Sequence, residues 1–212
     1  MRALELINNG EVVRYELPTS WSEVSLGSYA KLMSALENED ISEIELIVKT
    51  LNSLTGISTT ELTKVPLKEL KIAYAELQVL TSTMPSNKLV KMIDVNGDAY
   101  GFIPDFDLIT LGEFVDLDNY LQDCWSNLDK IMAVLYRKVT KVNKDDTYEI
   151  EKYELKTAKA NRELFKESLS IDVIYGSLVF FYAIGSKLMK DMVLSLEEEN
   201  KSLRKKLKKE KV

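Results

Sequence analysis

LELINNGEVVRYEL, residues 4–17, predicts a β-hairpin at the start of the chain. Its central dipeptide Asn9-Gly10 suits the positive φ angles of a type I′ turn. A two-residue loop pairs the flanking strands as Leu6 with Val13, Leu4 with Tyr15 and Glu5 with Arg14. Apolar and opposite-charge partners then lie opposite each other, as in a stable antiparallel pair. The fold therefore contains β-structure, although helical periodicity dominates the rest of the chain.

A second hairpin is predicted after Pro85. Residues 88–95 and 98–103 flank another turn dipeptide, Asn96-Gly97. Residues 94–105 also match a calcium-binding loop at positions 1, 3 and 5, with Asp105 at position 12. Ala99 replaces the glycine that such a loop needs at position 6, and Asp105 is shorter than the usual glutamate. The residues therefore favour a hairpin over a calcium site.

Amphipathic helices with capping signals fill most of the remaining chain. Helix starts are predicted at Ser25, at Pro66 and at the pairs Ser42…Glu45, Ser58…Glu61 and Thr110…Glu113. A helix stop is predicted at Gly56. A helix is predicted through Leu128, Ile131, Met132, Leu135 and Tyr136, and a charged helix from about Tyr148 to Ser168. The predicted fold class is mainly α (α+β), a helical bundle with two β-hairpins and a long C-terminal helix.

The two halves of the chain align with each other at an offset of 85 residues. Residues 24–32 (VSLGSYAKL) correspond to residues 109–117 (ITLGEFVDL), and each segment follows a hairpin and precedes a longer apolar helix. This predicts a duplicated hairpin-plus-helices unit; the alternative is two amphipathic helices with similar caps. The expected regions are 1–85, 86–187 with the shared core, and a charged C-terminal helix at 188–212.

One long helix is predicted from Ser170 to the end of the chain. Residues 173–186 carry no charge, but 14 residues are fewer than the roughly 20 that cross a bilayer. A buried core helix, with no membrane contact, is therefore expected there.

A heptad pattern follows the uncharged segment, with a single Asn at an a position, which favours parallel pairing of two helices. Its candidate partner-binding residues are Met189, Val193, Leu196, Asn200, Leu203 and Leu207, with Glu199 and Arg204 at flanking positions. Only about three heptads are present, so a docking helix and a solvated tail remain alternatives to a coiled coil. The pattern predicts protein partners or a homo-oligomer.

The charge of the chain is split between an acidic body and a basic end. Residues 201–212 hold seven Lys or Arg against Glu210, a formal charge of +6 within a chain whose net charge is −6. Lys205, Lys206, Lys208 and Lys209 form the centre of this basic tail. Such a tail could bind nucleic acid, whereas an acidic body repels it.

The absence of histidine excludes the catalytic dyads and triads that depend on it. The single cysteine, Cys124, forms no internal disulfide and lies beside Trp125 on an amphipathic segment, which favours packing over nucleophilic chemistry. Trp21 is expected to pack against the following helix. Asp105 and Asp107 could pair as carboxylates, but solvating their loop explains them better. No nucleotide-binding motif, secretory leader, cofactor site or metal site is predicted.

Two blocks of sequence resemble proteins of tailed phages. Residues 51–58 (LNSLTGIS), with Glu61-Leu62 and residues 66–70, are similar to small helical tail-assembly proteins, in which L-T-G-[IL]-S stops a helix. Residues 131–138 (IMAVLYRK), with the later charged helix and Val179-Phe180-Phe181, look like virion-associated proteins of gut phages. The second hairpin and the basic tail have no counterpart in the simplest tail chaperones.

The resemblance implies particle assembly, in the virion or in the host cytoplasm. The leading hypothesis is a non-enzymatic tail-assembly chaperone or head–tail junction component that binds other phage structural or tail proteins. The alternative is a virion-packaged cargo protein that contacts nucleic acid through its basic tail. An enzyme that uses carboxylates between Asp94 and Asp107 is the third hypothesis.

Overall fold

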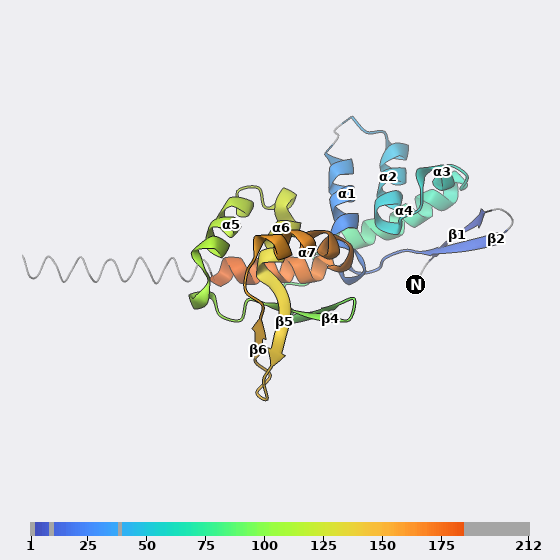
Figure 1. Ribbon diagram of the computed structural model, residues 1–212. Coiled ribbons are helices and arrows are strands. Elements are labelled where there is room, and N and C mark those ends of the chain that lie inside the picture. The colour runs from blue at the N-terminus through green and yellow to red at the C-terminus, as the bar shows by residue number, and fades with distance from the viewer. Residues whose placement is uncertain (1–2, 9–10, 38–39, 185–212) are drawn as a thin grey trace, which may run out of the picture.

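The computed structural model describes residues 3–8, 11–37 and 40–184 of the 212-residue chain (Figure 1). The fold is mixed α+β, with a two-stranded sheet, a four-stranded antiparallel sheet and helices that pack on and beside them. The expectation of α+β structure is confirmed. The expectation of a helical bundle is wrong, because a sheet of four strands occupies the second half.

The first hairpin has the predicted register. Strands β1 (Ala3–Asn8) and β2 (Glu11–Glu16) pair Leu4 with Tyr15 and Glu5 with Arg14. They form a sheet of their own that lies apart from the second sheet (Figure 1). The hydroxyl group of Tyr15 donates a hydrogen bond to Glu61, which ties the ribbon to the helices that follow.

The helices of the first half begin at their predicted start signals, and α2 ends at its predicted stop signal. The short 3-10 helix η1 (Trp21–Glu23) precedes α1 (Leu26–Leu36), α2 (Glu43–Thr55), α3 (Thr59–Leu62) and α4 (Leu67–Thr81). Ser58 and Glu61 form a reciprocal capping box. Gly56 ends α2 at a φ of 74°, a conformation that glycine adopts without steric cost.

The second hairpin is the edge of the larger sheet. Strands β3 (Met92–Val95) and β4 (Asp98–Phe102) meet at Asn96 and Gly97, whose φ angles of 55° and 84° confirm the predicted turn. Asp94 accepts a hydrogen bond from the backbone N–H of Gly97. The segment that matches a calcium loop is therefore an antiparallel hairpin and not a loop between two helices.

Two further strands, which the sequence did not reveal, complete this sheet in the order β3-β4-β5-β6. They are β5 (Tyr136–Val142) and β6 (Tyr148–Ile150). The predicted helices through Tyr136 and from Tyr148 are wrong at these positions. Tyr136 pairs with Phe102 of β4, and a Cβ atom on Gly101 would lie 2.4 Å from the ring of Tyr148. Both tyrosines thus depend on contacts with a strand distant in sequence.

Helices of the second half cover the sheet. They are η2 (Phe106–Leu108), α5 (Leu111–Leu121), η3 (Trp125–Asn127), α6 (Leu128–Leu135) and α7 (Leu155–Ser168), followed by a helix at residues 171–184. The predicted capping box of Thr110 and Glu113 is present at the start of α5. No helix in the described part of the chain is both long and apolar enough to span a membrane.

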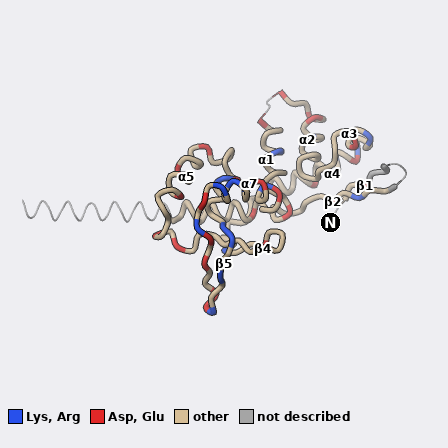
Figure 2. The backbone as a smooth tube through the Cα atoms, viewed as in Figure 1, with Lys and Arg blue, Asp and Glu red and all other residues tan. Residues whose placement is uncertain are grey.

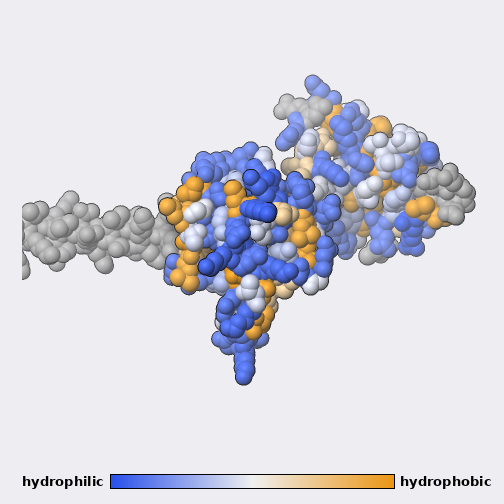
Figure 3. Space-filling model, viewed as in Figure 1, coloured by the Kyte–Doolittle hydropathy of each residue, from blue (hydrophilic) through white to orange (hydrophobic). Residues whose placement is uncertain are grey.

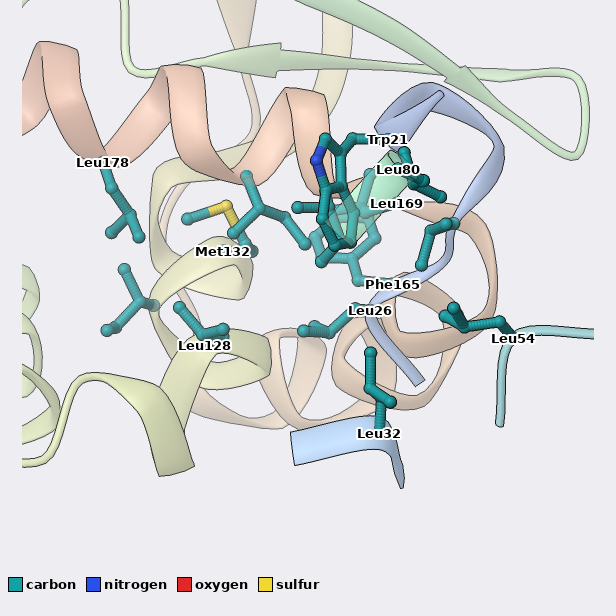
Figure 4. Packing of buried hydrophobic residues seen from close by; sticks show 14 of the residues in the cluster. Trp21, Leu26, Leu32, Leu54, Leu80, Leu128, Met132, Phe165, Leu169 and Leu178 are labelled. Atoms are coloured by element: carbon teal, nitrogen blue, oxygen red, sulfur yellow. The ribbon is translucent and has the colours of Figure 1, made fainter. Parts of the chain in front are cut away.

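One hydrophobic cluster joins the two halves (Figure 4). Leu26 and Leu32 of α1 pack near Phe165 and Leu169, which come from α7 and the residue after it. The backbone N–H of Leu26 donates to the carbonyl of Leu169 at 2.9 Å, and the N–H of Ile171 donates to the carbonyl of Val24 at 3.0 Å. These bonds flank an isolated antiparallel bridge between Ser25 and Ser170. Segments from opposite ends of the fold therefore build one core.

The aligned segments of the two halves share their caps but differ in their surroundings. Ser25 and Thr110 are both N-caps, each accepting from the backbone N–H three residues later. Within the described residues, the first hairpin pairs with no further strand, whereas the second pairs with β5. The duplication therefore stays a prediction that rests on the sequence.

Candidate protein-docking groove

An apolar groove lies where the two halves of the fold meet. Its walls are α1, the end of α4 with the residues after it, η3 with the start of α6, and the helix at residues 171–184. It encloses a volume of about 280 Å³. We call it the Trp125 groove; its lining residues are Trp21, Tyr29, Leu32, Met33, Leu36, Thr81, Thr83, Met84, Pro85, Trp125, Leu128, Ile171, Ile174, Tyr175 and Leu178.

Large apolar side chains form an exposed rim around this groove. Trp125 is 66% exposed and Met84 74%, while Met33 and Leu36 of α1 are 41% and 44% exposed. Single exposed apolar residues are common on soluble proteins, but a contiguous group around a concave surface marks an interaction site. Methionine side chains adapt to partners of different shape. The rim is therefore suited to an apolar partner surface.

Three aromatic rings line one side of the groove. Trp21 contacts Tyr29 edge to face at a centroid distance of 5.9 Å, and Tyr29 contacts Trp125 at 6.4 Å. The indole N–H of Trp21 donates to the carbonyl of Thr83 at 3.0 Å, which joins η1 to the segment after α4. Trp21 is buried, as expected for a residue that packs on the following helix. Two of the three rings are thus fixed by the core.

The position of Trp125 is set by the turn between α5 and α6. The side-chain amide of Asn127 donates to the carbonyls of Tyr120 and Asp123, which holds η3 against the end of α5. Among the described residues, the indole N–H of Trp125 has no hydrogen-bond partner. Tryptophan is enriched at the energetic centres of protein interfaces because it combines a large apolar area with one polar group. Trp125 is thus placed to act as an anchor for a partner.

The two threonine hydroxyl groups in the groove wall are already bonded. Thr81 donates to the carbonyl of Gln78 at 3.2 Å, and Thr83 donates to the carbonyl of Leu80 at 2.7 Å. Both side chains therefore turn their donors toward the end of α4. The wall offers mainly methyl groups, thioethers and ring faces, so recognition there depends on shape and apolar area.

The most buried ion pair of the described part of the chain lies away from this groove. The Nη2 of Arg137 on β5 is 2.6 Å from the Oε1 of Glu113 on α5, and their side chains are 11% and 3% exposed. The other oxygen of Glu113 accepts from the backbone N–H and the hydroxyl of Thr110. Burial lowers the pKa of Arg137, and the charge of Glu113 opposes that shift. Because both carboxylate oxygens of Glu113 are occupied, the pair has a structural role.

A second charged cluster joins α6 to α7. The Nε of Arg162 is 2.9 Å from the Oδ2 of Asp129, and Lys166 lies 3.6 Å from the same oxygen. Asp129 is buried, so two cations offset the cost of removing its charge from water. This cluster stabilises the packing of α7 on α6.

The residues considered for catalysis or metal binding serve the local structure. Asp98 pairs with Lys138 at 2.7 Å, and Asp105 accepts from the backbone N–H of Asp107 in η2. Burial raises the pKa of the Cys124 thiol, which lowers its reactivity. Within residues 3–8, 11–37 and 40–184, no group of three or more His, Cys, Asp or Glu is placed to hold a metal ion.

The predicted partner-binding residues of the C-terminal segment lie outside the described residues. They are Met189, Val193, Leu196, Glu199, Asn200, Leu203, Arg204 and Leu207, together with the basic residues Lys205, Lys206, Lys208 and Lys209. Their role stays a prediction. The Trp125 groove was not predicted, because Trp125 continues the apolar spacing of Phe114, Leu117 and Leu121 and periodicity alone would bury it.

Comparisons with models of protein families, with curated proteins and with solved structures give no match to this chain. Function is therefore inferred from the geometry of the surface and from the resemblance in the sequence.

Proposed function

We propose that this chain is a non-enzymatic assembly protein of a tailed-phage particle, which binds the apolar face of a helix from another particle protein in the Trp125 groove. The proposal is carried by one observation. A concave apolar surface with an exposed tryptophan, 66% accessible, lies at the junction of the two halves of the fold.

The shape and chemistry of the groove favour a helix as the bound element. Its walls are helices, and an amphipathic helix places side chains at positions i, i+3, i+4 and i+7 into grooves of this kind. Truncating an anchoring tryptophan in an interface costs about 2 kcal/mol or more. Because few polar groups line the groove, affinity would depend on Trp125, Met84 and Met33 more than on hydrogen bonds.

The arrangement of polar groups supports a binding role over a catalytic one. The carboxylates of Glu113 and Asp129 are buried in ion pairs, and Asp94 and Asp105 accept backbone hydrogen bonds in tight turns. The Cys124 thiol has a raised pKa. None of these groups faces the Trp125 groove.

The phage setting comes from the resemblance in the sequence. The LTGIS block lies at the end of α2, where Gly56 caps the helix and the amide of Asn52 donates to the carbonyl of Ile57 at 2.7 Å. Residues 131–138 cross from α6 into β5. Both blocks lie in the body of the fold and not at the groove, so they suggest a class of protein and leave the partner open.

The test is copurification from the native source, followed by titration of each purified companion protein. The wild-type chain, the double variant Met84→Glu/Trp125→Glu and the control Val142→Glu are compared. Val142 is 55% exposed on β5 and does not line the groove. We expect the double variant to bind at least about 10-fold more weakly, which corresponds to about 1.4 kcal/mol, and the control to bind as the wild type does.

Unchanged affinity in the double variant would rule out the groove as the binding site. A nucleic-acid complex that is lost on deletion of residues 201–212, and that weakens steeply with salt, would instead support the packaged-cargo alternative. The formal charge of +6 on those residues is the observation that favours this alternative.

A further inference from the structure

Helix α5 exposes an apolar face that no described residue covers. Leu111, Phe114 and Val115 are 78%, 58% and 46% exposed, and Leu108 just before the helix is 77% exposed. The opposite face of α5 is buried through Glu113 and Leu117. Positions three and four apart lie on one side of a helix, so these exposed residues form a stripe. We call this group the α5 face.

A groove runs along one edge of the α5 face. It encloses about 130 Å³ between η2, α5 and the end of the helix at residues 171–184. Figure 3 shows hydrophobic residues gathered at this end of the body. The lining residues are Phe106, Ile109, Phe114, Leu117, Asp118, Leu121, Phe181 and Ile184. Ile184 is the last described residue, so the chain leaves the described structure at this groove.

The surroundings of the α5 face are acidic. Residues 92–129 contain no Lys or Arg, and they contain nine carboxylates: Asp94, Asp98, Asp105, Asp107, Glu113, Asp116, Asp118, Asp123 and Asp129. Of these, Asp105, Asp107, Asp118 and Asp123 are exposed on η2, α5 or the turns beside them. In Figure 2, α5 carries red segments and no blue ones, whereas β5 and α7 carry blue segments. The face therefore combines apolar area with negative charge.

A segment with the complementary chemistry exists in the same chain. Val193, Leu196, Leu203 and Leu207 recur at helical spacing between residues 193 and 207. Residues 201–212 surround the last of these positions with a formal charge of +6. An apolar stripe flanked by cations matches an apolar stripe flanked by carboxylates, and such matching favours association.

The sequence of the C-terminal segment favours docking on a second molecule. After Gly185, which directly follows Ile184, residues 186–212 contain neither glycine nor proline, the residues that most often reverse the direction of a chain. An uninterrupted helix would carry Leu207 about 35 Å beyond Ile184, at 1.5 Å per residue. The basic part of the segment would then be far from the α5 face of its own molecule and free to reach another.

We propose that the basic C-terminal segment of one copy docks on the α5 face of a second copy, which joins the chains head to tail. The two contacting surfaces differ, so a pair of molecules keeps one free α5 face and one free C-terminal segment. Such an interface extends into an open chain, or closes into a ring where the rotation allows. The inference names a second copy of the chain as one partner, and it does not depend on the Trp125 groove.

A mixing experiment tests this directional contact. One variant, Leu111→Glu/Phe114→Glu, removes the α5 face and keeps the tail; the other lacks residues 201–212 and keeps the face. Both substituted side chains are more than half exposed, so the fold should persist, which circular dichroism checks. We expect oligomers for the wild type, monomers for each variant alone, and a 1:1 heterodimer when the two are mixed, all measured by light scattering after size exclusion.

Three results would overturn the proposal. The first is a wild-type chain that stays monomeric at 100-fold the concentration of the mixing experiment. The second is a face variant that self-associates as the wild type does, since tail-to-tail pairing predicts that result. The third is a mixture in which the two variants stay separate.

Charge reversal provides an independent readout of the same contact. Asp107→Lys/Asp118→Lys in the face and Lys205→Glu/Lys208→Glu in the tail should each weaken self-association about 10-fold. A mixture of the two charge-reversed chains should associate more tightly than either alone, because each reversed face then meets a reversed tail. Weaker association in the mixture than in either chain alone would contradict the proposed pairing. The Trp125 groove variants should self-associate as the wild type does. Failure of the head-to-tail contact is therefore distinguishable from failure of the proposed function.

Discussion

Replacing Arg137 with methionine should destabilise the fold more than any change at an exposed ion pair. The substitution leaves the carboxylate of Glu113, which is 3% exposed, without its cation. Breaking a buried ion pair from one side costs about 3–5 kcal/mol, because the remaining charge has lost its compensation. For a domain of this size, that loss corresponds to a fall in Tm of about 6–20 °C.

A double-mutant cycle separates the free energy lost with the ion pair from the free energy lost with the packing of the Arg137 side chain. Glu113→Gln removes the charge but keeps a residue that completes the capping box with Thr110. The double variant Glu113→Gln/Arg137→Met contains no buried charge at this site. We expect it to be more stable than Arg137→Met alone by about 2 kcal/mol, since buried ion pairs can be replaced by neutral groups at small cost.

The assay is urea unfolding followed by circular dichroism for all four proteins of the cycle. Lys138→Met is the matched control, because Lys138 follows Arg137 on β5 and its ion pair with Asp98 is about half exposed, at 48% and 51%. The control should lower the free energy of unfolding far less than Arg137→Met does, because solvent screens an exposed ion pair. The reasoning is refuted if Arg137→Met lies within about 1 kcal/mol of the wild type, or if the two single substitutions add within about 0.5 kcal/mol.

Three further predictions concern local packing and titration. Gly176→Ala would place Cβ 2.2 Å from the carbonyl oxygen of Lys88, so it should lower the free energy of unfolding by about 1–3 kcal/mol. The control Gly112→Ala meets nothing within 4 Å and should be neutral or slightly stabilising in thermal unfolding. Burial raises the pKa of Tyr136 to about 12. The stabilisation that the neutral phenol gives the folded state is therefore complete below pH 10 and is lost as the pH rises to 12. Tyr136→Phe should make the free energy of unfolding less dependent on pH between these values. Ser58→Ala removes a capping box and should cost about 1 kcal/mol in urea unfolding.

The hairpins and caps could be predicted because their signals are local. Asn96-Gly97 needs only its own φ angles to form a tight turn, and Ser58 bonds to a group three residues away. Each feature is decided within about four residues. For the same reason, the register of the first hairpin followed from its turn and the alternation of its strands.

Strands β5 and β6 could not be predicted because distant contacts select them. The apolar spacing of α6 continues into Tyr136, so periodicity alone extends the helix. The chain leaves the helix there because Tyr136 pairs with Phe102, and its hydroxyl group lies 2.6 Å from the carbonyl of Val90. The Trp125 groove escapes prediction for the same reason, since its walls come from four separated stretches of sequence.

The bridge between Ser25 and Ser170 means that the first half of the fold cannot be completed until residue 170 has been synthesised. While the polypeptide emerges from the ribosome, α1 lacks the carbonyl of Leu169 to which Leu26 donates. At about 5–20 residues per second, translation of the intervening stretch takes roughly 7–30 s. Throughout that interval α1 packs only on the helices of the first half, and the apolar side chains that later contact α7 lack their partners.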